Sequence, residues 1–156
     1  MAGFRISRSF LLVSLLVLIL SACGPVDVGL PDNGGDADLG GTSWRLVSYG
    51  SVGTETDIIE ETQPTLLFET DNEVTGFTGC NDFAAQYAVT NGSIVFSQIV
   101  RTEIFCTVEG VMDQEEAYLG ALETAETFEM AGDELRIYYG DGQRVLNFVR
   151  AEADGG

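Results

Sequence analysis

The stretch Tyr87-Ala88-Val89-Thr90-Asn91-Gly92-Ser93-Ile94-Val95-Phe96 decides the fold class of this 156-residue chain. Large apolar residues alternate with small or polar ones on both sides of Asn91-Gly92. Both central residues tolerate the positive φ of a type I′ turn, whose twist matches that of paired strands. The stretch therefore predicts a β-hairpin in which each strand buries one face.

Short strands separated by turns continue on both sides of this hairpin. Alternation at Trp44, Leu46 and Ser48 predicts a first strand, and residues 50–63 read as a polar loop. Further strand-like runs, with turns at Asp71-Asn72, Gly132-Asp133 and Gly140-Asp141-Gly142, cover 65–69, 74–77, 83–89, 128–130, 135–139 and 146–148. The pattern indicates six to eight strands.

One segment changes to a helical period. An apolar face between residues 111 and 125 is formed by Val111, Tyr118, Leu119, Leu122 and Ala125. Asp113 followed by Glu116 resembles a capping box, so the helix is expected to begin there or one turn earlier. Together these elements predict an α+β domain: an antiparallel curved sheet or partly open β-barrel with one covering α-helix.

The N-terminus has the layout of an export signal. Arg5 and Arg8 precede an apolar run, and residues 10–22 are too few to cross a bilayer as a helix. Leu20-Ser21-Ala22-Cys23 resembles the bacterial lipobox, which implies a signal peptide at 1–22 and a diacylglyceryl thioether on Cys23. A cleaved signal with a chance cysteine, or an uncleaved signal anchor, are the alternatives.

The lipobox resemblance also implies a location. Several acyl chains on Cys23 would hold the protein at a membrane where one chain holds it marginally. We expect an exported protein, lipid-anchored to the cell envelope. Gly24 in place of Asp implies the outer membrane if the cell has two membranes; otherwise the site is the outer face of the plasma membrane.

Two flanking segments read as unstructured. Residues 23–40 are rich in Gly, Pro and Asp and predict a flexible acidic linker, and 151–156 predict a disordered tail. The linker's Asp32, Asn33, Asp36 and Asp38 also invite a calcium interpretation. Their spacing does not match the calcium loop, so solvated linker is preferred and no metal is expected.

The charge balance excludes whole classes of function. Acidic residues number 25 against seven arginines, with no histidine, for a formal charge of −18. Nucleic acid is excluded as a partner because its binding needs clustered cations. Without His there is no Ser-His-Asp or Cys-His site. We therefore predict no catalytic residues and no cofactor; a hydrolase using two carboxylates is a distant alternative.

Two cysteines remain once Cys23 is assigned to lipid. Cys80 and Cys106, 26 residues apart, predict a disulfide because an even pair in an exported domain is usually oxidised. A reactive thiol with a lowered pKa is the alternative, for which Arg101 is the one nearby cation in the sequence. The turn Gly79-Cys80-Asn81-Asp82 is either a structural corner or a ligand-binding turn.

Several of these motifs together resemble the META domain, the HslJ-like family of bacterial proteins. The resemblance covers residues 41–150, with its most specific part at Gly79-Cys80-Asn81 followed by Thr102 and Cys106, and it extends over Gly41–Leu46, Pro64–Phe68, Val74–Phe83, Glu115–Leu122 and Leu135–Phe148. It implies a small α+β domain of secreted or envelope-attached proteins, often lipoproteins, associated with stress or envelope functions. It implies no catalytic residues.

The sequence therefore predicts a lipid-anchored envelope protein with a non-catalytic binding or structural role, and the family resemblance adds an expected role in envelope stress. Its expected contacts are the membrane, through the lipid on Cys23, and an envelope protein. The alternative is a small-ligand or cation-binding domain with an internal cavity lined by aromatic side chains. The candidates for that lining are Trp44, Phe77, Phe83, Phe128 and Phe148. Nothing in the residues indicates an oligomeric state.

Overall fold

The computed structural model describes residues 38–151. Predictions that fall outside these residues are the signal peptide at 1–22, the acylation of Cys23, residues 23–37 of the linker and residues 152–156 of the tail. The described part includes Asp38 to Gly40, which were assigned to the linker. Leu39 among them is buried in the core, so the folded domain begins before Gly41.

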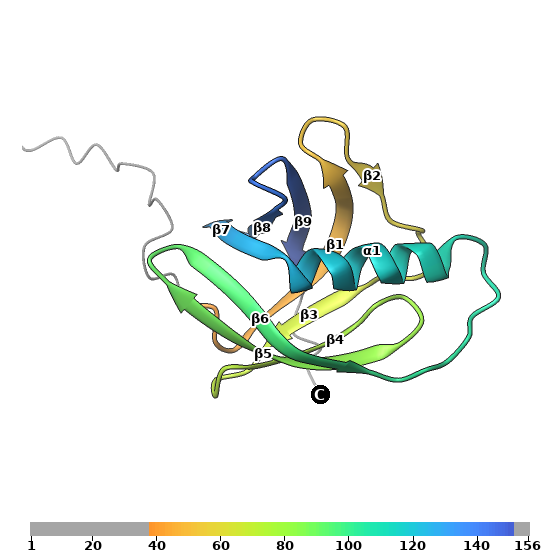
Figure 1. Cartoon of the computed structure of the whole chain (residues 1–156), viewed down its shortest axis with the longest axis horizontal. Helices are drawn as coiled ribbons and strands as arrows, with labels where there is room; N and C mark the ends of the chain where they lie inside the picture. Colours follow the sequence, from red (N-terminus) through yellow and green to blue (C-terminus); the bar gives the residue numbers. More distant parts are fainter. Residues whose placement is uncertain (1–37, 152–156) are drawn as a thin grey trace, which may run out of the picture. The chain divides into compact units, whose positions relative to one another are not determined.

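Within residues 38–151 the chain forms nine strands and one helix (Figure 1). The strands are β1 (Thr42–Ser51), β2 (Thr56–Asp57), β3 (Thr65–Phe68), β4 (Glu73–Phe77), β5 (Asp82–Thr90), β6 (Ser93–Arg101), β7 (Ala125–Ala131), β8 (Glu134–Tyr139) and β9 (Arg144–Arg150). The helix α1 (Val111–Glu123) connects β6 to β7. The strand count exceeds the predicted six to eight because β2 lies within 50–63, which was expected to be only loop.

Eight of the strands close into an antiparallel barrel. The order along the sheet is β1-β3-β4-β5-β6-β7-β8-β9, and β9 pairs back onto β1. β2 adds to β1 at two residue pairs and stands outside this circuit. The predicted α+β class with one helix is confirmed, and the barrel is closed rather than partly open. Closure removes the free sheet edges that would otherwise invite aggregation.

The barrel interior is a packed apolar core. Alternation along each strand brings one face inward, as at Trp44 and Leu46 in β1 and at Leu146 and Phe148 in β9. Four of the five aromatic residues considered as a cavity lining are buried in this core, namely Trp44, Phe83, Phe128 and Phe148. Phe77 is half-buried. These aromatic side chains thus fill the barrel.

The β5–β6 hairpin forms as its sequence predicts. Asn91 and Gly92 have φ values of 51° and 78°, the left-handed region that a type I′ turn requires. The two strands pair from Thr90 with Ser93 outward to Phe83 with Arg101. A register shift opposite Ala85, with Gln98 at φ 55°, bends β6 before it reaches the helix connection.

The helix buries the predicted face but begins earlier than its capping signal suggests. Gly110 occupies the N-cap position at φ 79°, and no side chain caps the helix. The helix thus begins one turn before Asp113, the earlier of the two predicted starts, and the capping box at Asp113 and Glu116 does not form. Within residues 38–151 no helix is long and apolar enough to cross a membrane.

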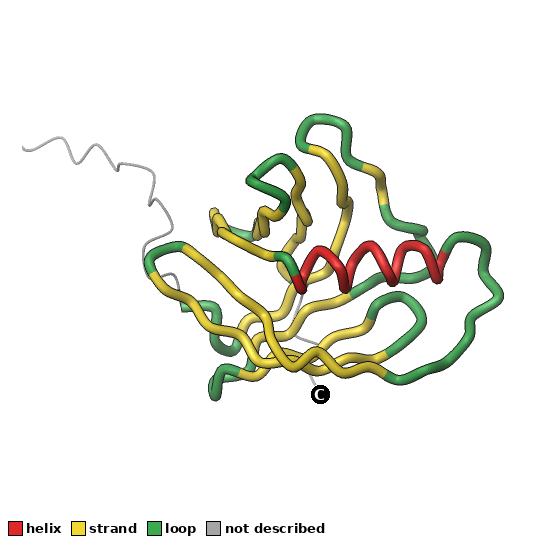
Figure 2. The backbone as a smooth tube through the Cα atoms, viewed as in Figure 1, coloured by secondary structure: helices red, strands yellow, loops and turns green. Residues whose placement is uncertain are grey.

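α1 lies across one opening of the barrel (Figure 2). The helix packs against β6 and β9, and the Tyr118 ring lies 5.8 Å from that of Phe83 and 6.2 Å from that of Phe148. The Tyr118 hydroxyl donates to the Thr65 carbonyl oxygen at 3.1 Å. The opening that α1 covers is thus closed by side chains of the helix, and the same helix positions the polar site described next.

Candidate functional site

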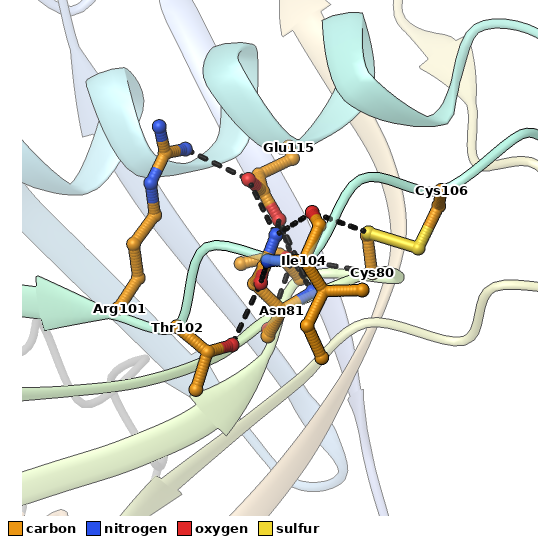
Figure 3. The surroundings of a disulfide bond; sticks show 8 residues. Cys80, Asn81, Arg101, Thr102, Ile104, Cys106 and Glu115 are labelled. Atoms are coloured by element: carbon orange, nitrogen blue, oxygen red, sulfur yellow. Dashed lines mark hydrogen bonds and ion pairs between the residues drawn. A yellow bond between two sulfur atoms is a disulfide. The ribbon is translucent and has the colours of Figure 1, made fainter.

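A buried polar cluster lies between α1 and the turn that joins β4 to β5 (Figure 3). We call it the Glu115 network; it consists of Thr78, Asn81, Arg101, Thr102, the backbone of Ile104, and Glu115. Glu115 and Asn81 are each 1% exposed, and Glu115 is the one charged residue buried among residues 38–151. Burying a carboxylate is costly unless it is fully hydrogen-bonded, so its partners decide what it does.

Both oxygens of the Glu115 carboxylate are occupied. Oε1 accepts from Arg101 Nη1 at 2.7 Å and from Asn81 Nδ2 at 3.1 Å. Oε2 accepts from the Asn81 backbone N–H at 3.1 Å, from Asn81 Nδ2 at 2.9 Å and from the Thr78 hydroxyl. Charge-assisted hydrogen bonds of this kind compensate the lost hydration. The carboxylate therefore organises its neighbours.

Asn81 extends the network to the loop between β6 and α1. Its Oδ1 accepts from the Thr102 hydroxyl at 2.7 Å and from the Ile104 N–H at 2.7 Å. Its Nδ2 donates to the Ile104 carbonyl oxygen at 3.0 Å. The Asn81 side-chain amide thus makes the same two hydrogen bonds to Ile104 that the backbone of a neighbouring β-strand would make. Asn81 therefore fixes the position of Ile104.

The turn that presents Asn81 depends on a glycine. Gly79 adopts φ 105°, and a Cβ there would lie 2.8 Å from Thr62 Cβ. Only glycine adopts this conformation without strain. The Thr78 N–H donates to the Asn81 carbonyl at 2.8 Å, which closes the turn. The turn Gly79–Asp82 is thus a corner held from inside, in accord with its structural interpretation.

A disulfide joins Cys80 to Cys106 beside this network. The two Cα atoms are 5.9 Å apart, and Cys80 Sγ lies 3.4 Å from the Ile104 carbonyl oxygen. Arg101, considered as a cation that could activate a thiol, pairs instead with Glu115. The bond ties the β4–β5 turn to the β6–α1 loop at the place where Asn81 also joins them.

A second buried polar group is formed by the residue next to Glu115. Gln114 Oε1 accepts from the Ile59 N–H at 2.7 Å, and Gln114 Nε2 donates to the Thr62 hydroxyl at 2.9 Å. Thr62 in turn donates to the Ile59 carbonyl at 2.6 Å. This set attaches the β2–β3 connection to the helix.

Sequence reasoning did not identify Glu115 and Gln114 as buried site residues. A signal was present, because Val111, Glu115 and Tyr118 follow the helical spacing of one face. A polar residue on the apolar face of a helix indicates a buried hydrogen-bond network only if the residues that pair with it can also be identified. Those partners are 34 residues away for Asn81 and 52 for Thr62, beyond any local pattern.

The site offers no arrangement of metal ligands. Among residues 38–151 there is no group of three His, Cys, Asp or Glu side chains that could hold a metal ion. Asp38, the described member of the calcium candidate, accepts from the Gly40 N–H at 2.9 Å. Asp32, Asn33 and Asp36 lie outside the described residues.

A groove of about 350 Å³ lies on the outer face of β1, β9 and β8. Val145, Asn147 and Val149 line it from β9, and Glu134, Arg136 and Tyr138 line it from β8. Val52 and Glu55 border it from the β1–β2 connection. The hydrogen bond from the Gly53 N–H, with a smaller attraction from Arg136, lowers the pKa of Glu55. The groove thus combines an apolar floor with charges of both signs.

Residues 38–151 form a closed eight-stranded barrel with a single helix between β6 and β7, and a disulfide ties down the loop before that helix. These features place the domain in a class of small α+β barrel domains. Within this class the chain belongs to the META domain family, whose model matches residues 37–153. The resemblance found from the sequence is confirmed. A search of curated proteins found no match.

Solved structures with the same fold are similar to this chain. A protein from Burkholderia xenovorans, solved by NMR, is 26% identical with a TM-score of 0.63, and the match covers 74% of this chain and 85% of that one. A DUF4847 family protein from Bacteroides vulgatus, solved by crystallography, is 11% identical with a TM-score of 0.54 over 74% and 96% of the two chains. The second likeness concerns the fold alone.

Proposed function

We propose that this META domain protein is a lipid-anchored protein of the cell envelope with a non-catalytic binding role. The lipobox residues Leu20 to Cys23 support the anchor, and the resemblance to META domain proteins implies an envelope setting. A role in the envelope stress response follows from the same resemblance. The domain would act by presenting a surface to a partner.

One observation carries the non-catalytic part of this proposal. Glu115, the buried carboxyl group of residues 38–151, receives hydrogen bonds on both oxygens from within the domain. A general acid or base must reach a substrate proton with a free lone pair or a free proton. Glu115 has neither a free lone pair nor a free proton to offer a substrate. Its hydrogen bonds instead hold the loop that follows β6.

Intact mass of the full chain, purified from bacterial membranes, tests the anchor. We expect cleavage before Cys23, a diacylglyceryl-scale mass addition, and alkylation of Cys80 and Cys106 only after reduction. A Cys23→Ala variant is the control and should leave the membrane fraction. An unmodified Cys23 together with free Cys80 and Cys106 would overturn the proposal and favour a thiol-based function.

The stress role has its own test in cells. A strain lacking the protein should lose viability under heat or envelope damage, and the wild-type gene should restore it. A Cys23→Ala gene should not, because the domain would be released from its membrane. Equal survival of the deletion strain and its parent under these conditions would remove the stress role from the proposal.

The outer groove favours small-ligand binding as a second candidate function. Arg136 with Glu55 and Glu134 offers both a cation and anions beside the apolar floor of Val145 and Val149. Such a site suits a small zwitterion with an apolar part. Titration of free amino acids, followed by amide NMR shifts, tests it: saturable shifts confined to β1, β8 and β9, and absent in Arg136→Ala, are expected. Unchanged spectra would reject this class of ligand.

A further inference from the structure

The loop at residues 102–110, between β6 and α1, exposes large apolar side chains. Phe105 is 78% exposed, Ile104 57% and Val108 51%. Single exposed apolar residues are ordinary on protein surfaces, but a phenylalanine open to water with two aliphatic neighbours within five residues is a local concentration. These residues are called the loop tip below.

The loop that carries this tip is held rigidly. The Thr102 N–H donates to the Asp82 carbonyl at 3.0 Å, and Asn81 pairs with both the N–H and the carbonyl of Ile104. The disulfide then fixes Cys106 immediately after Phe105. An exposed side chain on an ordered backbone loses less conformational entropy on binding than one on a loose loop. The Glu115 network thus pre-organises the loop tip.

Negative charge surrounds the loop tip. Glu103 and Glu109 are exposed within the loop, and Asp82 is exposed where β5 meets it. The one cation at its start, Arg101, is paired with Glu115. The surface complementary to this pattern is an apolar pocket with lysines or arginines at its rim. A bilayer with anionic headgroups would repel the same pattern.

The loop tip also projects away from the start of the folded domain. In Figure 1 the start of β1, drawn in orange, lies in the left part of the folded domain, and the connection from β6 to α1 lies at its right-hand end. Attachment through the N-terminal side of the domain therefore leaves this connection accessible to a partner protein.

We propose that Ile104, Phe105 and Val108 form a docking site for a partner protein that offers an apolar pocket rimmed by basic residues. Phe105 is the central anchor, and Glu103 and Glu109 pair with the rim. This inference rests on the proposed binding role and names the surface that performs it.

Photo-cross-linking in the full-length protein tests the proposal. p-Benzoylphenylalanine replaces Phe105 in the bacterial host, and the matched control carries it at Val95, which is 54% exposed on β6. We expect position 105 to link to one protein, at apolar residues with Lys or Arg beside them, and position 95 not to. With that protein purified, Phe105→Ser should weaken binding at least about tenfold and Val95→Ser should not.

Two further variants test the charge and the rigidity. Glu103→Gln with Glu109→Gln should weaken binding and reduce its salt dependence, and Asn81→Ala should weaken it through the loop although it leaves the loop tip intact. Links from position 105 to lipid, to a second copy of this chain or to nothing would each overturn the docking site. So would equal binding by the Phe105→Ser variant.

Failure here is distinguishable from failure of the proposed function. Cross-links from Val52 at the outer groove, without any from Phe105, would keep a binding role and reject this surface. An unmodified Cys23 would reject the anchor whatever position 105 contacts.

Discussion

The barrel is closed in two different ways at two places. Where β1 meets β9, seven residue pairs run from Trp44 with Arg150 to Ser51 with Arg144, with one register shift between Leu46 and Ser48. Where β6 meets β7, a single pair is formed, Ser93 with Thr127. The first junction pairs the first and last long strands of the folded chain. The second pairs two strands that are separated along the chain by α1.

The difference shows what can replace a hydrogen-bonded ladder. At the β1–β9 junction, backbone hydrogen bonds and buried neighbours such as Leu46 and Phe148 hold the strands together. At the β6–β7 junction the chain passes through α1, which packs against β6 and β9, and the Glu115 network and the disulfide attach the helix and its preceding loop to the β4–β5 turn. The segment that connects β6 to β7 is therefore held by side chains and one covalent bond, whereas β1 and β9 are held by backbone pairing.

Removing the disulfide should cause the largest loss of stability among the proposed variants. Cys80→Ala with Cys106→Ala releases a loop with a sequence separation of 26 residues. The chain-entropy model predicts a loss of about 3.5 kcal/mol in the free energy of unfolding. Denaturant unfolding measures it, and reduction of the wild-type protein should give a comparable loss. A loss under about 1 kcal/mol would contradict this account.

Removing the buried carboxylate should come next. Glu115→Ala leaves Asn81 and Thr78 without their acceptor, whereas Arg101, 45% exposed, can turn to water. We expect a loss of about 3 kcal/mol in unfolding free energy. Glu116→Ala, one residue along on the exposed face, is the matched control and should change stability by less than about 0.5 kcal/mol. Equal effects of the two variants would show that the network contributes nothing.

A smaller effect is expected at the hairpin that makes the single β6–β7 contact. The Gly92 carbonyl accepts from the Phe128 N–H at 3.2 Å, and Gly92 has φ 78°. Gly92→Ala should cost about 1 to 2 kcal/mol through backbone strain. Gly120→Ala, in the helix with open space around the new Cβ, should instead stabilise by about 0.5 to 1 kcal/mol. Amide exchange should report faster opening at Phe128 in the first variant; unchanged exchange there would count against the strain argument.

The smallest expected effect concerns the tyrosine under the helix. Tyr118→Phe should lose about 1 kcal/mol at neutral pH because the Thr65 carbonyl loses a donor. Burial raises the pKa of Tyr118 well above its ordinary value. Below about pH 10 both the folded and unfolded states keep the proton, so this contribution is constant.

Above that pH the unfolded chain ionises first, and the free energy of unfolding falls with rising pH. Part of this alkaline decline should be absent in Tyr118→Phe. Thermal melts from pH 8 to 11.5 measure it. The remaining decline has another source, because burial also raises the pKa values of Tyr87, Tyr138 and Tyr139. Identical declines in variant and wild type would show that Tyr118 does not couple folding to pH.

Local patterns in the sequence predicted much of the fold. The Asn91-Gly92 turn, the alternation at Trp44 and Leu46, and the apolar face of α1 were all found from neighbours within a few residues. These features follow from backbone conformations and side-chain periods that a residue and its near neighbours determine. The helix begins at the earlier of the two predicted starts, where Gly110 occupies the N-cap position, so the capping box at Asp113 does not form.

The candidate site depended on contacts that no local pattern contains. The number of cysteines and the predicted export of the chain predicted the pairing of Cys80 with Cys106. Glu115, in contrast, is a site residue because of its contact with Asn81, which is 34 positions away in the sequence. Likewise, Phe105 was an ordinary apolar residue until the structure left it exposed on a clamped loop.

Local patterns along the chain specify the eight barrel strands, the turns, the helix face and the family of this protein, but not β2. The pairing of β1 with β9, which closes the barrel, follows only from the packing of distant segments. A hydrogen bond between Asn147 and Ser48 joins residues 99 positions apart there. Turn conformations and side-chain periods depend on the energies of neighbouring residues. Barrel closure depends instead on which distant strands bury each other's apolar faces, and this is determined only when the whole chain packs.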